Sequence, residues 1–183
     1  VMTPIYATST YAHDKPGSHK GYEYSRSQNP TREVLESSLA ELENGKRAFA
    51  FASGVAAQTA ILDTLKPGDH VIAFDDLYGG TFRLFNEIKS KSSNLQFSFV
   101  DLNSNFSKYI KQNTKMIWIE SPTNPLLKIT DLKRIARIAR KNNLITVCDN
   151  TFATPYNQRP LEFGIDIVNH STTKYINGHS DII

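Results

Sequence analysis

A lysine near the C-terminal end of the sequence could do covalent chemistry. Lys174 follows three hydroxyl residues in the stretch HSTTKYINGHSD, directly after an apolar run. A lysine in a polar loop is usually a solvated surface cation. The same amine, if it lies in a pocket, can form an imine with a phosphorylated aldehyde, and neighbouring hydroxyl groups can bind the phosphate. Other residues of the sequence have to favour one of these interpretations.

Asp149 is the second residue whose position suggests chemistry. It ends the apolar stretch LITVCD, where a buried carboxylate is costly unless it is paired. Asp149 could cap the turn that follows through Asn150 and Thr151. It could also bind a protonated ring nitrogen of a cofactor. The sequence around Asp149 alone leaves both interpretations open.

A third feature is the turn Ser53-Gly54-Val55-Ala56-Ala57, where a predicted strand meets a predicted helix. The free N–H groups and partial positive charge of a helix N-terminus suit a phosphate. The turn matches neither GxGxxG nor GxxxxGK[ST], so dinucleotide and triphosphate binding are disfavoured. A single phosphate monoester, or no ligand at all, remains open.

These residues lie at the ends of predicted strands. Residues 1–30 show no sustained period and predict an extended arm. Beyond the arm, hydrophobic patterning predicts helices over 31–43, 54–65, 82–90, 107–112 and 130–142. It predicts strands over 47–53, 70–75, 95–100, 115–120, 144–149 and 166–171. This alternation indicates an α/β fold with a mostly parallel sheet flanked by helices. Ligands of such sheets bind beyond the carboxyl ends of the strands, where Asp149 and Lys174 converge.

Length and composition are those of a globular domain. The 183 residues are 39% hydrophobic and 21% charged, and the net charge of +3 does not indicate nucleic acid or a membrane surface as a partner. The single cysteine, Cys148, excludes an internal disulfide and fits a reducing compartment. No apolar run is long enough to span a bilayer. We therefore expect a cytoplasmic protein. No histidine or cysteine spacing predicts a metal site. The basic residues of 130–142 predict a solvated helix face.

Six segments in order carry a family resemblance: GYEYSRSQNPTR, FASGVAA, DDLYGGTFRLF, WIESPTNP, VCDNTFATPY and HSTTKYINGHSD. They resemble the pyridoxal-phosphate enzymes of the transsulfuration (Cys/Met metabolism) family, which includes cystathionine γ-synthase and cystathionine γ-lyase. The resemblance implies fold type I, the aspartate-aminotransferase-like architecture, with pyridoxal 5'-phosphate as cofactor. It implies that 31–183 is an incomplete cofactor-binding large domain. The small C-terminal domain would be absent from this chain.

The resemblance also implies roles for individual residues. Lys174 matches the lysine that bonds to the cofactor aldehyde and then moves protons. Asp149 matches the partner of the pyridinium nitrogen, and Tyr78 matches the tyrosine that stacks on the ring and assists proton transfer. The remaining cofactor contacts within the predicted large domain would be Gly54, Val55, Ser171 and Thr173 at the phosphate and Thr151 beside the ring.

Further roles implied by the resemblance concern the substrate and a second subunit. Asn124 matches a residue near the cofactor hydroxyl or the substrate carboxylate. Tyr24 and Arg26 match a pair that reaches the phosphate of a neighbouring subunit, so the arm 1–30 would be a clasp within a homotetramer. Glu23 would read the distal amino group of cystathionine. The arginine expected to hold the substrate carboxylate would lie beyond residue 183.

The activity implied is γ-elimination or γ-replacement on a sulfur amino acid in methionine or cysteine metabolism. Gly80 stands where methionine γ-lyases have a cysteine. The stretches SRSQNPT and YGGTFRLF look like the γ-synthase and γ-lyase branch rather than the enteric cystathionine β-lyase. The alternatives are a cystathionine β-lyase, an O-acetylhomoserine sulfhydrylase-type member and a non-catalytic assembly fragment of such an enzyme. A nucleotide-binding α/β protein is disfavoured because both glycine-rich fingerprints are missing.

Overall fold

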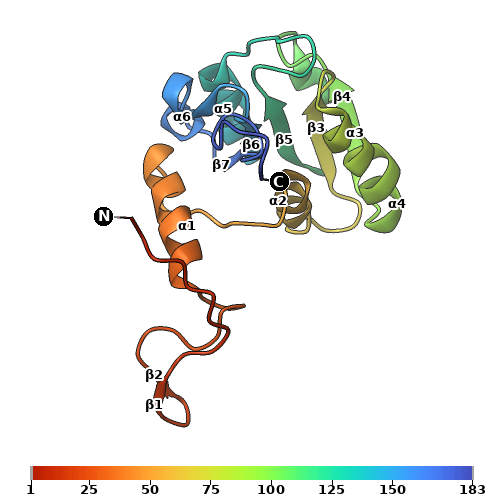
Figure 1. Ribbon diagram of the computed structural model, residues 1–183. Helices are drawn as coiled ribbons and strands as arrows, with labels where there is room; N and C mark the ends of the chain where they lie inside the picture. The colour runs from red at the N-terminus through yellow and green to blue at the C-terminus, as the bar shows by residue number, and fades with distance from the viewer. Residues whose placement is uncertain (1, 183) are drawn as a thin grey trace. The chain divides into compact units, whose positions relative to one another are not determined.

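The protein is described by a computed structural model that covers residues 2–182. The chain divides into two compact units, one up to Ala50 and one from Phe51 onward (Figure 1). The first unit contains the short antiparallel strands β1 (His13–Lys15) and β2 (Ser18–His19) and the helix α1 (Pro30–Leu42). The predicted helix over 31–43 is therefore confirmed, and the predicted arm contains a small hairpin.

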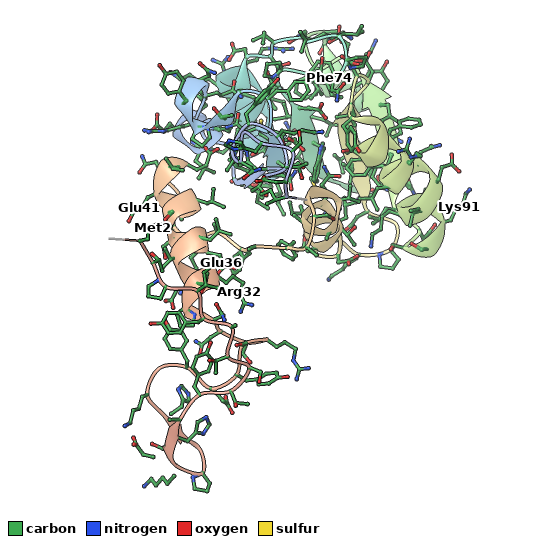
Figure 2. All side chains as sticks on the ribbon, in the orientation of Figure 1. Met2, Arg32, Glu36, Glu41, Phe74 and Lys91 are labelled. Atoms are coloured by element: carbon green, nitrogen blue, oxygen red, sulfur yellow. The ribbon has the colours of Figure 1, made fainter. Side chains whose placement is uncertain are left out.

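Local chemistry sets the start of α1. The side chain of Asn29 accepts hydrogen bonds from the N–H groups of Thr31 (2.9 Å) and Arg32 (3.2 Å), and Pro30 occupies the first helical turn. On the helix surface the Arg32 guanidinium faces Glu36 at i+4 with an N–O distance of 3.9 Å (Figure 2). The cap and the proline explain why the helix begins one residue before the predicted start.

The second unit is built on a five-stranded parallel sheet with the strand order β4-β3-β5-β6-β7. Its strands are β3 (His70–Phe74), β4 (Gln96–Val100), β5 (Thr114–Glu120), β6 (Ile145–Asp149) and β7 (Ile167–Asn169). Five of the six predicted strands and the parallel α/β architecture are thus confirmed. In β5 and β6, Glu120 pairs in register with Asp149, so the two strands end together.

One predicted strand is wrong. Residues 47–53 form no strand, and Phe49 and Phe51 are 70% and 48% exposed. Alternating phenylalanine and alanine favour a strand locally, but a strand also requires a neighbour's backbone to pair with. Within residues 2–182 no strand forms a β-ladder with this segment.

The helices of the second unit connect the strands. They are α2 (Gly54–Leu62), α3 (Gly79–Arg83), a π-helical segment (Leu84–Lys89), α4 (Ser90–Ser92), α5 (Leu132–Lys141) and α6 (Thr154–Asn157). Two 3₁₀ turns span Phe106–Tyr109 and Pro160–Phe163. The first overlaps only the first half of the helix predicted over 107–112. The predicted helix over 82–90 is therefore the central part of a longer irregular helix that begins at Gly79.

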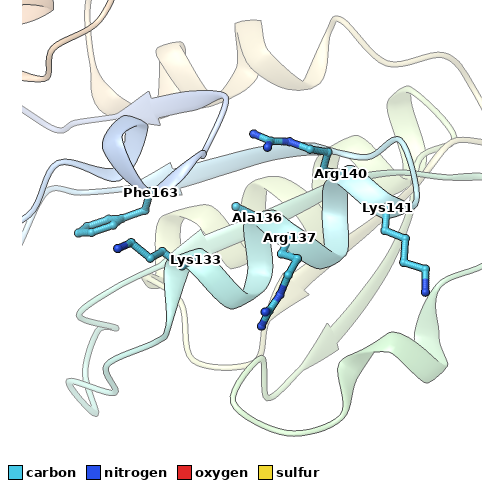
Figure 3. Close-up of a pocket in the computed structure, with 6 residues that line it drawn as sticks. All are labelled: Lys133, Ala136, Arg137, Arg140, Lys141 and Phe163. Atoms are coloured by element: carbon cyan, nitrogen blue, oxygen red, sulfur yellow. The ribbon is translucent and has the colours of Figure 1, made fainter.

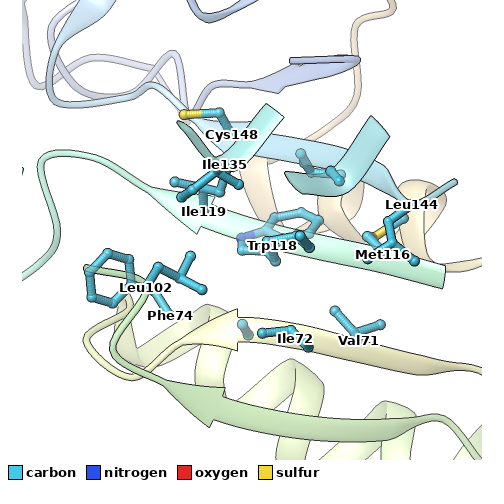
Figure 4. Close-up of a cluster of buried hydrophobic side chains, with 14 of the residues drawn as sticks. Val71, Ile72, Phe74, Leu102, Met116, Trp118, Ile119, Ile135, Leu144 and Cys148 are labelled. Carbon is cyan, nitrogen blue, oxygen red and sulfur yellow. The ribbon is translucent and has the colours of Figure 1, made fainter. Parts of the chain in front are cut away.

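The core lies around the central strand β5 and its neighbour β3 (Figure 4). Val71 and Ile72 on β3 and Met116 and Trp118 on β5 are fully buried. Phe85 from the π-helical segment meets the Trp118 ring edge-on at 5.1 Å. Strands covered on both faces read as continuous apolar runs, which is why HVIAF and MIWI were recognisable in the sequence. This core holds the strand ends that carry the polar residues.

Candidate active site

A cavity of about 250 Å³ lies in the second unit, where β5, β6 and the turn after β7 end near the start of α2. The lining includes nine residues predicted for the site: Gly54, Val55, Tyr78, Asn124, Asp149, Thr151, Ser171, Thr173 and Lys174. Residues that sequence reasoning did not assign complete it: Ser53, Gln58, Glu120, Pro122 and Phe152. The parallel sheet therefore brings together residues that are up to 121 positions apart (from 53 to 174).

The N-terminus of α2 forms one wall. The Ser53 side chain caps the helix by accepting from the Ala56 N–H (3.1 Å). A Cβ atom on Gly54 would lie 3.0 Å from Cβ and 3.2 Å from Cα of Ser171. Only glycine lets the helix approach the turn after β7 so closely. The result is a narrow cradle of backbone N–H and hydroxyl groups, which suits a phosphate.

Asp149 lines the cavity and is 7% exposed. Its carboxylate accepts three hydrogen bonds: from Asn169 Nδ2 (2.8 Å), from the Thr151 N–H (3.0 Å) and from Gln58 Nε2 (3.3 Å). Three converging donors hold the carboxylate in one orientation. Gln58 is one helical turn after Gly54 and so shares its face of α2, a spacing that sequence reasoning overlooked.

Lys174 follows β7 in a tight turn. Its N–H donates to the Ser171 carbonyl (3.2 Å), while the Ser171 N–H donates to Thr151 Oγ1 (2.9 Å) and so ties this turn to the end of β6. The Lys174 side chain lines the cavity and is exposed, and its amine makes no ion pair within residues 2–182. The amine is therefore accessible to a ligand.

Tyr78 also lines the cavity; it directly precedes α3 and is 46% exposed. Gly80 lies against the tyrosine ring: a Cβ atom there would overlap the edge of the ring and would lie 3.0 Å from its Cζ. The Tyr78 N–H donates to Glu120 Oε2 (3.0 Å). Gly80 thus leaves room for the Tyr78 ring, and Glu120 holds the Tyr78 backbone.

Asn124 lies in the loop that follows β5. Asp76, which is 8% exposed, accepts hydrogen bonds from Thr123 Oγ1 and from the Leu126 N–H (3.0 Å). The Thr123 hydroxyl in turn accepts from the Lys128 N–H (2.8 Å). This buried network holds the loop in shape. Sequence reasoning missed Asp76 because DD in AFDD shows two acids without indicating which one is buried.

Glu120 has the most perturbed ionisation in the cavity. Burial raises its pKa to about 8, and the nearby charges of Asp149 and Asp76 act in the same direction. Hydrogen bonds from the Tyr78 and Asn124 N–H groups partly offset this rise. Sequence reasoning missed Glu120, although it ends an apolar strand just as Asp149 does.

The set of side chains fits pyridoxal phosphate. The helix N-terminus and the hydroxyls of Ser171 and Thr173 offer phosphate ligands, Asp149 offers a carboxylate for a ring nitrogen, and Lys174 offers an amine for an aldehyde. Because Gly54 has no side chain, the start of α2 can approach Ser171 closely. Within the described residues no group of His, Cys, Asp and Glu has the arrangement of a metal site.

Three predicted site residues, Glu23, Tyr24 and Arg26, belong to the first unit. There the Arg26 guanidinium lies 5.0 Å from the centre of the Tyr24 ring, at the distance of a cation–π contact. Their predicted role toward a neighbouring subunit stays a prediction.

A second hollow, of about 480 Å³, lies along α5 (Figure 3). It is lined by Lys133, Ala136, Arg137, Arg140, Lys141 and Phe163. The Lys133 amine lies 5.5 Å from the Phe163 ring centre. The hollow has no carboxylate, hydroxyl or amide side chain in its lining, so it offers none of the acid–base groups found at the sheet edge.

The profile of the family described as "Cys/Met metabolism PLP-dependent enzyme" matches residues 1–183. The chain belongs to this family. Among curated relatives it is 60% identical to a cystathionine β-lyase of Coxiella burnetii, 53% to a probable cystathionine γ-synthase of Herpetosiphon aurantiacus and 51% to a cystathionine γ-lyase of Bacillus subtilis. The alignments cover 100% of this chain but 48%, 58% and 48% of those proteins, so the chain spans about half of their length.

Solved structures of family members have the same fold. The crystal structure of metB from Corynebacterium glutamicum matches with a TM-score of 0.96 and 46% identity, over 100% of this chain and 48% of that one. A cystathionine γ-lyase from Lactobacillus plantarum, solved with L-serine, matches with a TM-score of 0.95 and 47% identity, over 98% and 47% of the two chains. The predicted fold type I architecture is confirmed. No helix in residues 2–182 combines the length and apolar character needed to cross a membrane.

Proposed function

We propose that the protein containing this chain is a pyridoxal-phosphate enzyme that performs γ-elimination or γ-replacement on a sulfur amino acid, as cystathionine γ-lyases and γ-synthases do. The observation that carries the proposal is that Lys174, Asp149 and the Gly54 cradle line one cavity. An amine, a buried carboxylate and a phosphate cradle are the three groups that pyridoxal phosphate requires.

Each side chain has a definite task in this proposal. The N-terminus of α2, with Ser171 and Thr173, binds the phosphate. Asp149 holds the proton on the ring nitrogen, and its three donors keep the carboxylate in place. When bound, the cofactor withdraws electrons from the substrate Cα. Lys174 would then remove the Cα proton, would have to give that proton up to become a free amine again, and would next remove a proton from Cβ and pass it to the departing γ substituent.

Tyr78 and Asn124 act on the substrate side of the cavity. Tyr78 covers the cofactor ring and assists proton transfer near the substrate amine. Asn124 binds the cofactor hydroxyl or the substrate carboxylate. Tyr24 and Arg26 reach the phosphate of a neighbouring subunit in a homotetramer, and Glu23 contacts the distal amino group of cystathionine. Within the cytoplasm such an enzyme would serve methionine or cysteine metabolism.

β-Elimination is the second candidate. The 60% identity to the Coxiella burnetii cystathionine β-lyase favours it, whereas the predicted branch was the γ-synthase and γ-lyase one. The two reactions leave different carbon skeletons. β-Elimination of cystathionine yields a three-carbon oxoacid, ammonia and homocysteine, and γ-elimination yields a four-carbon oxoacid, ammonia and cysteine. An O-acetylhomoserine sulfhydrylase-type activity would instead require an activated homoserine and a simple thiol.

The test is the absorbance spectrum of the full-length protein before and after addition of cystathionine. We expect a visible band from the bound cofactor that shifts with substrate and is missing in Lys174→Ala. Lys133→Ala, a lysine outside this cavity, is the control and should keep the band. Chromatography of the oxoacid then separates β- from γ-elimination. A wild-type protein that gains no band from added pyridoxal phosphate would instead support a non-catalytic assembly role.

A further inference from the structure

Glu120 is a buried acid to which the proposed chemistry assigns no task. It is the last residue of β5, it is 6% exposed, and its side chain lines the cavity. Across the sheet it stands in register with Asp149. Two carboxyl groups therefore lie side by side at the edge where the cofactor would bind.

The carboxyl group of Glu120 contacts both sides of the cavity. Its Oε2 accepts from the Tyr78 N–H at 3.0 Å. It also accepts from the N–H of Asn124, in the loop after β5. Tyr78 directly precedes α3 and Asn124 follows β5, so one side chain joins two segments that are distant in sequence.

We propose that Glu120 is a positioning residue, whose carboxyl group ties Tyr78 and Asn124 to the end of β5 and so fixes the two walls that hold the cofactor. This inference rests on the proposed function. In this role Glu120 does not react itself; it holds the segments that carry Tyr78 and Asn124.

The charges around Glu120 determine its protonation. Asp149 faces it from β6 and Asp76 from the end of β3, while Lys174 and Tyr78 line the same cavity. Burial, with the two acids adding to it, raises the pKa of Glu120 to about 8. Near neutral pH Glu120 is therefore mostly protonated. Asp149, whose carboxyl group accepts three hydrogen bonds, is left as the partner for a ring nitrogen.

The raised pKa of Glu120 should make the free energy of unfolding of the apoprotein depend on pH. The folded protein keeps a proton on Glu120 that the unfolded chain releases near the ordinary value of 4.5. Unfolding therefore becomes more favourable as pH rises from about 4.5 to about 8. Glu120→Gln, which cannot ionise, should remove this component of the pH dependence.

The experiment compares wild type, Glu120→Gln and Glu120→Ala as full-length apoproteins. Glutamine keeps the shape and an oxygen that accepts N–H groups, so its dissociation constant for pyridoxal phosphate should stay within about threefold of wild type. Alanine loses both hydrogen bonds, and its dissociation constant should rise by about tenfold or more. The induced circular dichroism of the bound cofactor should change in Glu120→Ala only. Glu43→Gln is the matched control, because Glu43 is also 6% exposed and does not line the cavity.

The two proposals fail in different ways. If wild type does not bind pyridoxal phosphate, the proposed function is wrong, and with it the role of Glu120 toward the cofactor. If wild type binds it and Glu120→Ala binds it equally well with an unchanged dichroism signal, only the positioning role is overturned. A pH dependence of apoprotein unfolding that is identical in wild type and Glu120→Gln would likewise contradict a protonated Glu120.

Discussion

The Cα of Gly54 lies so close to Ser171 that a Cβ atom on the glycine would be 3.0 Å from the serine Cβ. The start of α2 and the turn after β7 are therefore in contact through the one residue type that has no side chain. The neighbouring atoms include backbone, which cannot turn away as a flexible side chain can. The proposed phosphate cradle depends on this approach.

Gly54→Ala should therefore weaken phosphate binding. The added methyl group pushes α2 and Ser171 apart, and we expect the dissociation constant of pyridoxal phosphate to rise about tenfold or more, as for 1–3 kcal/mol of overpacking. Pyridoxal, which lacks the phosphate, should lose much less affinity. Titration of the apoprotein with both compounds measures this ratio. An equal loss for both would show that the cradle does not bind the phosphate.

Gly80→Ala should displace the Tyr78 ring. In a helix, alanine is ordinarily more stable than glycine by about 1 kcal/mol. Here its Cβ would overlap the ring, so the ring must move. We expect kcat to fall by about tenfold and the induced dichroism of the cofactor to change. Gly79→Ala is the matched control, because its Cβ would meet only the end of the Arg83 side chain at 3.4 Å. Equal behaviour of the two variants would contradict the prediction.

His70 should make the fold sensitive to acid. Its ring is fully buried and hydrogen-bonds Thr114 and Ser98, each at 2.8 Å. Burial, and secondarily the charge of Lys111, lowers its pKa from 6.5 to about 4. The unfolded chain binds the proton first, so stability is complete above about pH 6.5 and falls as pH decreases toward 4. The loss is on the order of 3 kcal/mol.

Urea unfolding at pH 7.5 and at pH 5 measures the larger part of this loss, about 2 kcal/mol, because pH 5 still lies above the pKa of the folded protein. His70→Asn should be less stable than wild type at both values but less dependent on pH. His13→Asn, in the exposed β1, is the control and should keep the wild-type dependence. A His70→Asn variant with the full wild-type dependence would assign the acid sensitivity to other groups.

If the arm reaches the site of a neighbouring subunit, the variants Arg26→Ala and Lys174→Ala should complement each other in a hybrid dimer. Each variant, Arg26→Ala and Lys174→Ala, should be defective by itself. In a hybrid dimer one of the two sites would combine an intact lysine with an intact arginine from the other chain. If equal amounts of the two variants associate at random, about half of the dimers are hybrids, and each hybrid has one intact site. The mixture should therefore recover about a quarter of the wild-type activity. Co-expression with two affinity tags provides the hybrid, and no recovery in it would place Arg26 in the site of its own subunit.

The sequence by itself determined the strands, the helices and the carboxyl edge at which the polar residues meet. HVIAF, MIWI and the end of LITVCD are apolar runs long enough to indicate buried strands, and a parallel sheet must bring their ends together. That reasoning was sufficient to place Asp149 and Lys174 at one edge, and both line one cavity. It failed for residues 47–53, because a strand depends on a partner that local patterning does not show.

Only the tertiary structure decided which of the similar residues are buried and what they contact. Glu120 and Asp149 both end apolar strands, and Asp75 and Asp76 are adjacent, yet burial and hydrogen bonding separate them. Asp75 forms an exposed ion pair with Lys128, while Asp76 holds the loop after β5. Protonation and positioning arise from neighbours that are distant in sequence, such as Gln58 for Asp149 and Tyr78 for Glu120. Such contacts exist only once the chain has folded.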